Sequence, residues 1–247
     1  MRIINVLVLS SVVWSSALWA DWEGRTVWAG ITKLSTPLTG MIEQVLVTPG
    51  EYVRQGQVLL RMDQRVVRAR VAEAVANAEY ASLQQQEMAR ELERAEELYE
   101  RTLLADHELD LARIAAARGM AEYRAAQAAE AKAREALLHS ELRAPFAARV
   151  LSQHVASGEI VNNQFFAIPM LVVANSEQML VSLRLGAEQV VGLSQGMALV
   201  VEVDGERHPA SLKAISYDPG SGDYHLEVLF TPSQRIIAGM PARVRLP

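Results

Sequence analysis

The spacing of apolar positions between residues 64 and 139 predicts two long helices. This stretch contains no proline and a single glycine, Gly119, and it is rich in Ala, Glu, Arg, Leu and Gln, which favour helix. Apolar or small residues recur at alternating steps of four and three, the spacing of a coiled-coil seam. The first seam comprises Val67, Val71, Ala74, Ala78, Ala81, Gln85, Met88, Leu92, Ala95 and Tyr99. The second comprises Leu109, Ala112, Ala116, Gly119, Tyr123, Ala126, Ala133 and Leu137.

The two seams are separated between Thr102 and Asp106, where the first pattern has stopped and the second has not begun. Glu130 occupies a position of the second seam where an apolar residue would be expected. At about 1.5 Å per residue, two helices of roughly 35 residues each would form a rod on the order of 50 Å long. Asp63 is the expected N-cap of the first helix, and Pro145 lies beyond the end of the second.

The segments on either side of the helices repeat one another. A shift of 108 residues, which aligns Pro37 with Pro145, gives five further matches. The matched pairs are Ile42 and Val150, Val47 and Val155, Gly50 and Gly158, Glu51 and Glu159, and Val53 and Val161. Each copy predicts a strand, a glycine turn and a second short strand. Neither copy has enough apolar surface for a core of its own, so we expect the copies to pair, which forces the helices into a hairpin.

From residue 171 onward the pattern changes to short alternating strands, with one short helix at about residues 187–193. Six strands and one short helix predict a small β-barrel. The expected strands are 171–174, 179–185, 198–203, 210–216, 224–230 and 242–246.

The first twenty residues have the composition of a secretory signal peptide. Met1 and Arg2 precede an apolar run, and Ala20 offers the small residue needed for cleavage before Asp21. An uncleaved N-terminal anchor is the alternative. The chain has no cysteine, which excludes a disulfide framework and a lipid anchor on cysteine. Its formal net charge of −5 excludes a strongly basic nucleic-acid binder.

The repeated segments carry a resemblance to a known family. Residues 37–60 resemble the first half of a biotinyl/lipoyl-type domain, and residues 143–161 resemble the closing half found in periplasmic adaptor subunits. These adaptors are also called membrane fusion proteins, of the HlyD and RND-efflux kind. The segment from Ile237 to Ala242 is similar to the stretch that precedes the last barrel strand in this family.

The resemblance implies an α+β, multidomain and elongated fold, in which an α-helical coiled-coil hairpin is inserted in a split lipoyl-like β-domain and followed by a small β-barrel. The expected parts are a signal peptide (1–20), an N-terminal segment (21–35), the split lipoyl-like domain (36–63 and 140–173), the hairpin (64–139) and the β-barrel domain (174–247). A membrane-proximal domain is expected to be absent.

The same resemblance implies a function without catalysis. It predicts a periplasmic adaptor that links an inner-membrane transporter, RND or ABC, to a TolC-type outer-membrane channel in an efflux or secretion system. The copies are expected to self-associate, as a trimer or a hexamer, because one hairpin cannot enclose a channel. No cofactor, metal, catalytic residue or nucleic-acid partner is expected.

The tip of the hairpin is the expected partner-binding site. In this family the tip contacts the channel through an Arg, a Leu and a Ser followed by acidic residues, and the residues at these positions are Arg94, Leu98, Ala105, Glu108 and Asp110. Arg94 and Leu98 lie four residues apart, on one helical face. The serine is replaced by Ala105, which removes a helix cap, so we expect Asp106 to cap instead. Alternatively, the charged residues here belong only to the solvated face of a coiled coil.

Two other functions compete with the adaptor. A biotin or lipoyl carrier needs a lysine at the turn between the two halves, but the only lysines are Lys33, Lys132 and Lys213, and the helices occupy that turn. A periplasmic ligand- or metal-binding accessory module is the other alternative. His107 and Asp110 have a spacing compatible with a metal pair, while the nine methionines form no cluster.

Overall fold

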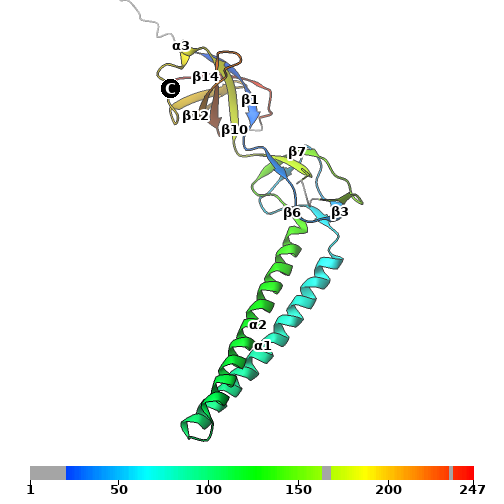
Figure 1. Cartoon of the computed structure of the whole chain (residues 1–247). Helices are drawn as coiled ribbons and strands as arrows, with labels where there is room; N and C mark the ends of the chain where they lie inside the picture. Colours follow the sequence, from blue (N-terminus) through cyan, green and yellow to red (C-terminus); the bar gives the residue numbers. More distant parts are fainter. Residues whose placement is uncertain (1–20, 163–167, 234–235) are drawn as a thin grey trace, which may run out of the picture. The chain divides into compact units, whose positions relative to one another are not determined.

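The computed structural model describes residues 21–162, 168–233 and 236–247, so the expected signal peptide lies outside the described residues. The chain forms two compact units (Figure 1). One unit is continuous, from Gly30 to Ser176. The other combines residues 21–29 with Glu177–Pro247. Among the described residues, no helix has both the length and the apolar composition that a membrane crossing requires.

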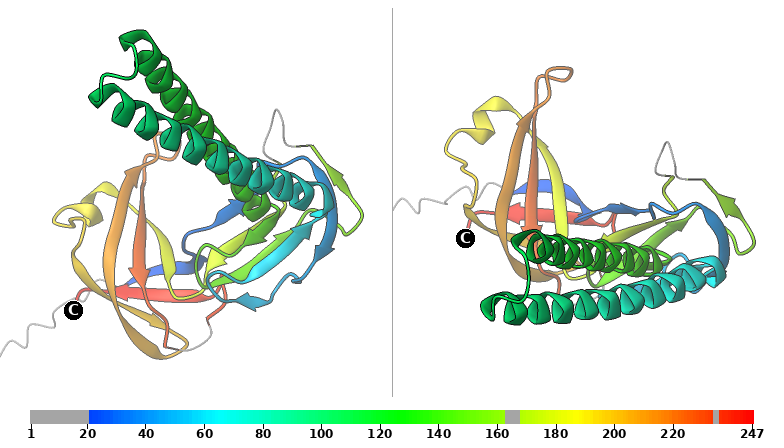
Figure 2. Two further views of the ribbon diagram at one scale, coloured as in Figure 1. Left: turned by 90° about the horizontal axis from the view of Figure 1, so that it is seen from below. Right: turned by 60° about the horizontal axis from the view of Figure 1, so that its bottom comes forward.

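Two helices, α1 (Arg65–Glu100) and α2 (Asp106–His139), lie side by side within the Gly30–Ser176 unit (Figures 1 and 2). Their lengths, 36 and 34 residues, are close to those expected. Along α1 the predicted seam from Val67 to Ala95 is buried or half-buried, and Tyr99 alone is exposed. Along α2 the whole second seam is buried or half-buried, and Glu130 is half-buried with it.

Gly119 marks a close approach of the two helices. It is one of the two buried residues of α2. A Cβ atom at Gly119 would lie 3.3 Å from Cγ of Met88 and 3.4 Å from Cα of Gln85. Glycine therefore stands here because the backbone of α1 leaves little room for a side chain.

The helices begin and end at a buried polar contact. The side-chain amide of Gln64 donates a hydrogen bond to the hydroxyl of Ser140 at 2.8 Å, and both residues are buried. The expectation that Asp63 is the N-cap of α1 was wrong, because the N-cap is Gln64. Asp63 still acts on the helix start, since its carboxylate accepts the backbone N–H of Arg65 at 3.0 Å.

The β-structure of the same unit consists of two four-stranded sheets. Their strand orders are β2-β9-β7-β4 and β6-β5-β3-β8. The strands of the first sheet are β2 (Thr32–Leu34), β9 (Leu171–Asn175), β7 (Ala148–Gln153) and β4 (Tyr52–Val53). The strands of the second are β6 (Glu141–Arg143), β5 (Val58–Met62), β3 (Gly40–Val45) and β8 (Ile160–Val161).

The two sheets are built from the sequence repeat, each with strands from both copies. β3 corresponds to β7 and β4 to β8 under the shift of 108 residues, yet β3 pairs with β8 and β4 pairs with β7. One hydrophobic core contains the matched isoleucine and valine residues of both copies, including Val47 and Val155. The two copies therefore complete each other, as their small apolar surfaces required.

The second unit is a closed antiparallel barrel with the strand order β1-β10-β13-β12-β11-β14. Its strands are β1 (Trp22–Trp28), β10 (Met179–Leu185), β11 (Ala198–Val203), β12 (Glu206–Tyr217), β13 (Tyr224–Phe230) and β14 (Pro241–Arg245). The short helix α3 (Ala187–Val190) follows β10. Inward-facing residues of all six strands form the core, among them Trp22, Val181, Val201, Leu226 and Val244.

The barrel has six strands, as expected, but one strand differs from the prediction. The strand at 171–174 does not belong to it, because β9 pairs with β2 and β7 in the other unit. Its place is taken by β1, which pairs with β10 and β14 and closes the barrel. The segment 21–35, which had no assigned fold, thus contributes β1 to the barrel and β2 to the sheets.

Candidate partner-binding site at the hairpin tip

The tip of the hairpin is the loop at residues 101–105, at the end of the helices farthest from the two sheets (Figure 1). The backbone N–H of Thr102 donates to the carbonyl of Tyr99 at 2.8 Å, and that of Leu103 donates to the carbonyl of Leu98 at 2.9 Å. These two bonds form a Schellman motif. Thr102 has a φ of +61°, a region that usually requires glycine. The tip is therefore a defined turn with local backbone strain.

The second helix begins without a side-chain cap from Asp106. Its N-cap is Ala105, and the carboxylate of Glu108 reaches back to accept the N–H of Ala105 at 3.4 Å. The expectation that Asp106 would act as the cap was thus wrong. Asp106 instead raises the pKa of Tyr99, through a hydrogen bond from the phenol to its carboxylate. Asp106 and Glu108 in the first turn also place negative charge at the positive end of the helix dipole.

Arg94 forms ion pairs within its own helix. Its guanidinium contacts the carboxylate of Glu91 and lies 3.3 Å from that of Glu87. The hydrogen bond from Arg94 lowers the pKa of Glu91, and the same bond raises the pKa of Arg94. These ion pairs are exposed, so water and salt weaken them. Arg94 can therefore exchange Glu91 for an acceptor on a partner.

Leu98 lies beside other exposed apolar residues at the tip. Leu98 and Tyr99 are 41% and 42% exposed, and Leu103 in the loop is 70% exposed. On α2, Leu111 and Ile114 are also exposed, whereas Leu109 between the helices is buried. If the seam residues are lettered a and d of a heptad, Arg94 and Leu111 are at position c and Leu98 is at position g. Positions c and g lie on the same side of the seam, so these three residues are on one flank of the hairpin.

Leu103, Leu111 and Ile114 were not among the predicted site residues. Their signal in the sequence is that they are large apolar residues outside both seams, close to the break between the helices. Such residues lack a place in the coiled-coil core, so they face solvent or a partner. Asp110, the remaining predicted residue, is exposed, and its carboxylate lies 3.4 Å from the guanidinium of Arg113.

The metal alternative finds no support in the part of the chain that the structure describes. No three His, Asp or Glu side chains come together there in an arrangement able to hold an ion. His107 and Asp110 would thus provide at most two ligands, fewer than a structural or catalytic zinc site needs.

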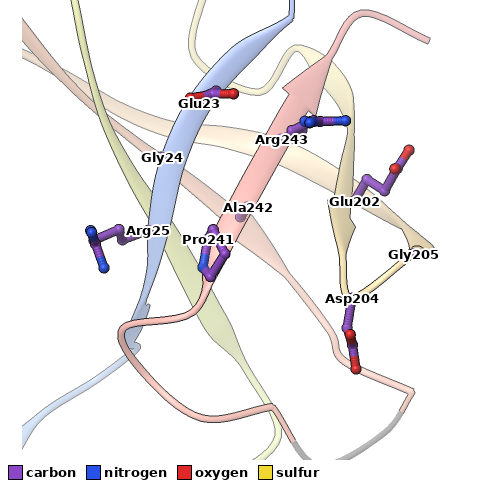
Figure 3. Close-up of a pocket in the computed structure, with 9 residues that line it drawn as sticks. All are labelled: Glu23, Gly24, Arg25, Glu202, Asp204, Gly205, Pro241, Ala242 and Arg243. Atoms are coloured by element: carbon purple, nitrogen blue, oxygen red, sulfur yellow. The ribbon is translucent and has the colours of Figure 1, made fainter.

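A cleft of about 460 Å³ in the barrel is a second candidate site (Figure 3). It lies along β1 and β14 and beside the turn at Asp204 and Gly205. Opposite charges face each other across its strands, since Arg243 is the register partner of both Glu23 and Glu202. Such cross-strand pairs stabilise the sheet. The tip, where large apolar side chains are exposed, is the stronger candidate for binding a protein.

Comparison with known proteins gives the family. A family model described as a CzcB-like, barrel-sandwich hybrid domain matches residues 30–168, more than half of the chain. This chain belongs to the CzcB-like barrel-sandwich hybrid family. The matched range begins at the first residue of the Gly30–Ser176 unit and includes both helices of the hairpin.

Two relatives of this CzcB-like chain come from two strains of Pseudomonas putida. They are the probable efflux pump periplasmic linker protein SepA and the toluene efflux pump periplasmic linker protein TtgD. Each is 26% identical over 241 residues, which is 90% of this chain and 59% of the relative. The chain therefore spans about three fifths of their length. The resemblance to periplasmic adaptor proteins is confirmed.

Solved structures share the fold of the CzcB-like chain. The membrane fusion protein Spr0693 from Streptococcus pneumoniae R6 matches with a TM-score of 0.69 at 14% identity, over 92% of this chain and 98% of that one. A MacA–MexA chimera that contains the Pseudomonas aeruginosa MexA α-hairpin domain matches with a TM-score of 0.68 at 16% identity, over 92% and 82%. The mixed α/β architecture with a small barrel is thus that of membrane fusion proteins.

Proposed function

We propose that this protein is a non-enzymatic periplasmic adaptor that links an inner-membrane transporter to a TolC-type outer-membrane channel. The observation that carries the proposal is the hairpin tip, where Arg94, Leu98 and Leu103 are exposed at the end of two helices. The names of the two Pseudomonas relatives, both periplasmic linkers of efflux pumps, support the same role.

In this proposal each part of the Gly30–Ser176 unit has a mechanical task. The two sheets act as a split lipoyl-like domain that holds the base of the hairpin through Gln64 and Ser140. Leu98 enters an apolar groove between channel helices, and Arg94 binds a carboxylate or carbonyl at its rim. Ala105, Glu108 and Asp110 complete the contact from the second helix.

Several copies would stand side by side as a trimer or hexamer, because a sealed conduit requires a closed ring of hairpins. The inner-membrane partner belongs to the RND or the ABC class. The contact with the outer-membrane channel requires that the protein be exported to the periplasm.

Cross-linking in cells tests the proposal. Because the chain has no cysteine, Leu98→Cys and Ala105→Cys each introduce a single thiol at the tip. A thiol-to-amine cross-linker should join each variant to an outer-membrane channel subunit. Leu138→Cys, equally single and exposed but near the base of α2, is the matched control and should give no such adduct. The proposal fails if an exported Leu98→Cys variant gives no channel adduct.

A further inference from the structure

A groove of about 470 Å³ lies between α1 and α2, about midway along the hairpin. Ala78, Glu79 and Ser82 line it from α1, and Tyr123, Gln127 and Glu130 line it from α2. The groove exists because the seam is poorly filled at this level. Ala78 is too small to cover the space, and the carboxylate of Glu130, which lines the groove, pairs with Arg134 at 2.7 Å.

The opposite flank of the same helical turns carries a protruding aromatic side chain. Tyr80 is 65% exposed, and its hydroxyl makes no hydrogen bond within the described part of the chain. It lies two residues from both Ala78 and Ser82, which is about 200° around the helix. In heptad terms Ser82 is at e and Tyr80 is at c, so they face away from each other.

The two flanks also carry complementary charges near this level. Glu79 is exposed at the groove, and Lys132 is exposed on the Tyr80 flank. Neither side chain forms an ion pair within the residues that the structure describes. Glu79 and Glu130 line the same groove, and Lys132 is two residues, or about 3 Å along the axis, from Glu130. Because Gly119 packs against Gln85 and Met88, Glu79 is level with about residues 125–128 of α2. Lys132 is therefore on the opposite flank and about 6–10 Å nearer the base than Glu79, a difference that two extended side chains can span.

A ring brings these two flanks together. In a cyclic assembly whose axis runs along the hairpins, every residue keeps its height from copy to copy, and each interface joins one flank to the other. The level of Tyr80 in one copy is then the level of the groove in the next. A phenol is a large, rigid group with an apolar body and a polar end, and the groove offers carboxylate and amide groups beside apolar ones.

We propose that the hairpins associate laterally by insertion of Tyr80 of one copy into the Ala78–Tyr123 groove of the next copy, with the extended side chain of Lys132 of the first reaching the carboxylate of Glu79 of the second. The occupant of the groove is thus a second copy of this chain, bound head to tail. This inference rests on the proposed adaptor function, which requires a ring, and adds the contact that sets the register between neighbouring hairpins.

The cysteine-free chain allows a directional test in the cells that produce and export it. In the double variant Tyr80→Cys/Ser82→Cys the two thiols lie on opposite faces of one helix, so they cannot close a bond within one chain. Oxidation should produce a ladder of dimers, trimers and larger species. Tyr80→Cys alone should stay monomeric, because a head-to-tail contact never places two copies of Tyr80 together. Tyr80→Cys/Ala125→Cys, with both thiols on one flank, is the matched control and should form no ladder.

The second part of the test exchanges the charges of Lys132 and Glu79. Lys132→Glu should lower the ladder yield by about two- to fivefold, as expected for one partly exposed ion pair. Adding Glu79→Lys to that variant should restore the yield. A failure of the exchanged pair to restore it would overturn the ionic part of the contact.

The outcomes separate this inference from the adaptor function. A dimer formed by Tyr80→Cys alone would mean a two-fold symmetric contact, and an adduct of Ser82→Cys with a different protein would mean another occupant; either result overturns the proposal. A missing ladder together with a channel adduct at Leu98→Cys would also overturn it, and the adaptor function would stand. If both are missing in the exported protein, the adaptor function itself fails.

Discussion

Gly50 and Gly158 occupy the same position in the two copies of the repeat, and each donates its backbone N–H to a strand of the other copy. Gly50 donates to the carbonyl of Val150, and Gly158 donates to the carbonyl of Ile42, both at 2.8 Å. The acceptors are themselves related by the same shift of 108 residues. The two copies of the repeat therefore exchange equivalent backbone hydrogen bonds, which relates them by an approximate two-fold symmetry.

This relationship predicts that the two glycines respond alike to substitution. Gly50 has a φ of +92° and Gly158 a φ of +86°, and a Cβ atom at either position would meet nothing within 4 Å. The cost of an alanine is therefore conformational strain alone, about 1–2 kcal/mol. We expect Gly50→Ala and Gly158→Ala to lower the free energy of unfolding by the same amount in urea denaturation.

Gly186 provides the control for these substitutions. A Cβ atom at this position would also meet nothing within 4 Å, but the φ of Gly186 is −70°. Alanine is a poorer N-cap than glycine for α3, but it also lowers the entropy of the unfolded chain, and these effects, each about 0.5–1 kcal/mol, oppose each other. Gly186→Ala should therefore change the free energy of unfolding less than Gly50→Ala or Gly158→Ala. Unequal losses at Gly50 and Gly158 would contradict the equivalence of the two turns.

Much of the fold was predictable because it rests on strong local patterns. The seams predicted the buried faces of both helices, since an apolar residue every three or four positions leaves one face to bury. The repeat predicted that Ile42 and Val150 share a core, because neither copy could bury its apolar residues alone. Three barrel strands, β10, β11 and β13, have the predicted bounds.

The partition of strands between the two units was not predictable in the same way. The strand at 171–174 and that at 179–185 are both apolar and only a few residues apart, so the pattern gives no boundary between them. The boundary depends on hydrogen bonds to distant partners. β9 pairs with β7, whereas β10 pairs with β1, which is more than 150 residues away in the sequence. At the tip, the exposed Leu111 and Ile114 were missed because they fit neither seam.

Thr102 predicts a stabilising substitution at the tip. Its φ of +61° is strained for threonine and natural for glycine, while the Schellman bonds use only backbone atoms. Thr102→Gly should stabilise the turn by about 0.5–1 kcal/mol, after the larger entropy of unfolded glycine is subtracted. Slower amide hydrogen exchange at Leu103 would report this gain. Thr102→Ala keeps a Cβ atom and should give no gain; equal gains in both variants would contradict the role of φ.

Ala105 predicts a second stabilising substitution. Its φ of −81° and ψ of 152° are those of an N-cap, but the alanine side chain offers no acceptor, so the N–H of Glu108 bonds only to the backbone carbonyl of Ala105, at 3.0 Å. Ala105→Ser should complete a capping box with Glu108 and stabilise the start of α2 by about 1 kcal/mol. Amide exchange at Glu108 should then slow by roughly fivefold. In the Glu108→Ala background the gain should shrink, and an undiminished gain would exclude the capping box.

The close approach of the helices at Gly119 predicts that a larger side chain at this position destabilises the hairpin. Because a Cβ atom there already meets Met88 at 3.3 Å, Gly119→Leu must push the helices apart. We expect a loss of about 1–3 kcal/mol in the free energy of unfolding, as for overpacked cores. Ala117→Leu, two residues away on the exposed side of α2, is the matched control and should be nearly neutral. Similar losses in both variants would mean that helix packing does not limit this position.

Asp63 predicts how the base of the hairpin responds to acid. Its carboxylate accepts a hydrogen bond from the Arg65 guanidinium at 2.6 Å and from the Arg65 backbone N–H at 3.0 Å. These bonds lower the pKa of Asp63 from 3.8 to about 2. Since the folded state holds the proton less tightly than the unfolded state, the stabilisation is complete above about pH 4 and is lost as the pH falls toward about 2.

Two variants isolate that contribution. Asp63→Asn should make the stability of the hairpin base less dependent on pH between 4 and 2, measured by amide exchange at Arg65 and Arg68 across this range. In Arg65→Met the strongest bond to the carboxylate is removed, so the pKa of Asp63 should rise toward 3.8 in an NMR titration. If the pKa stays near 2 without Arg65, the backbone N–H alone holds the carboxylate in its charged form, and the ion pair has no part in fixing the start of α1.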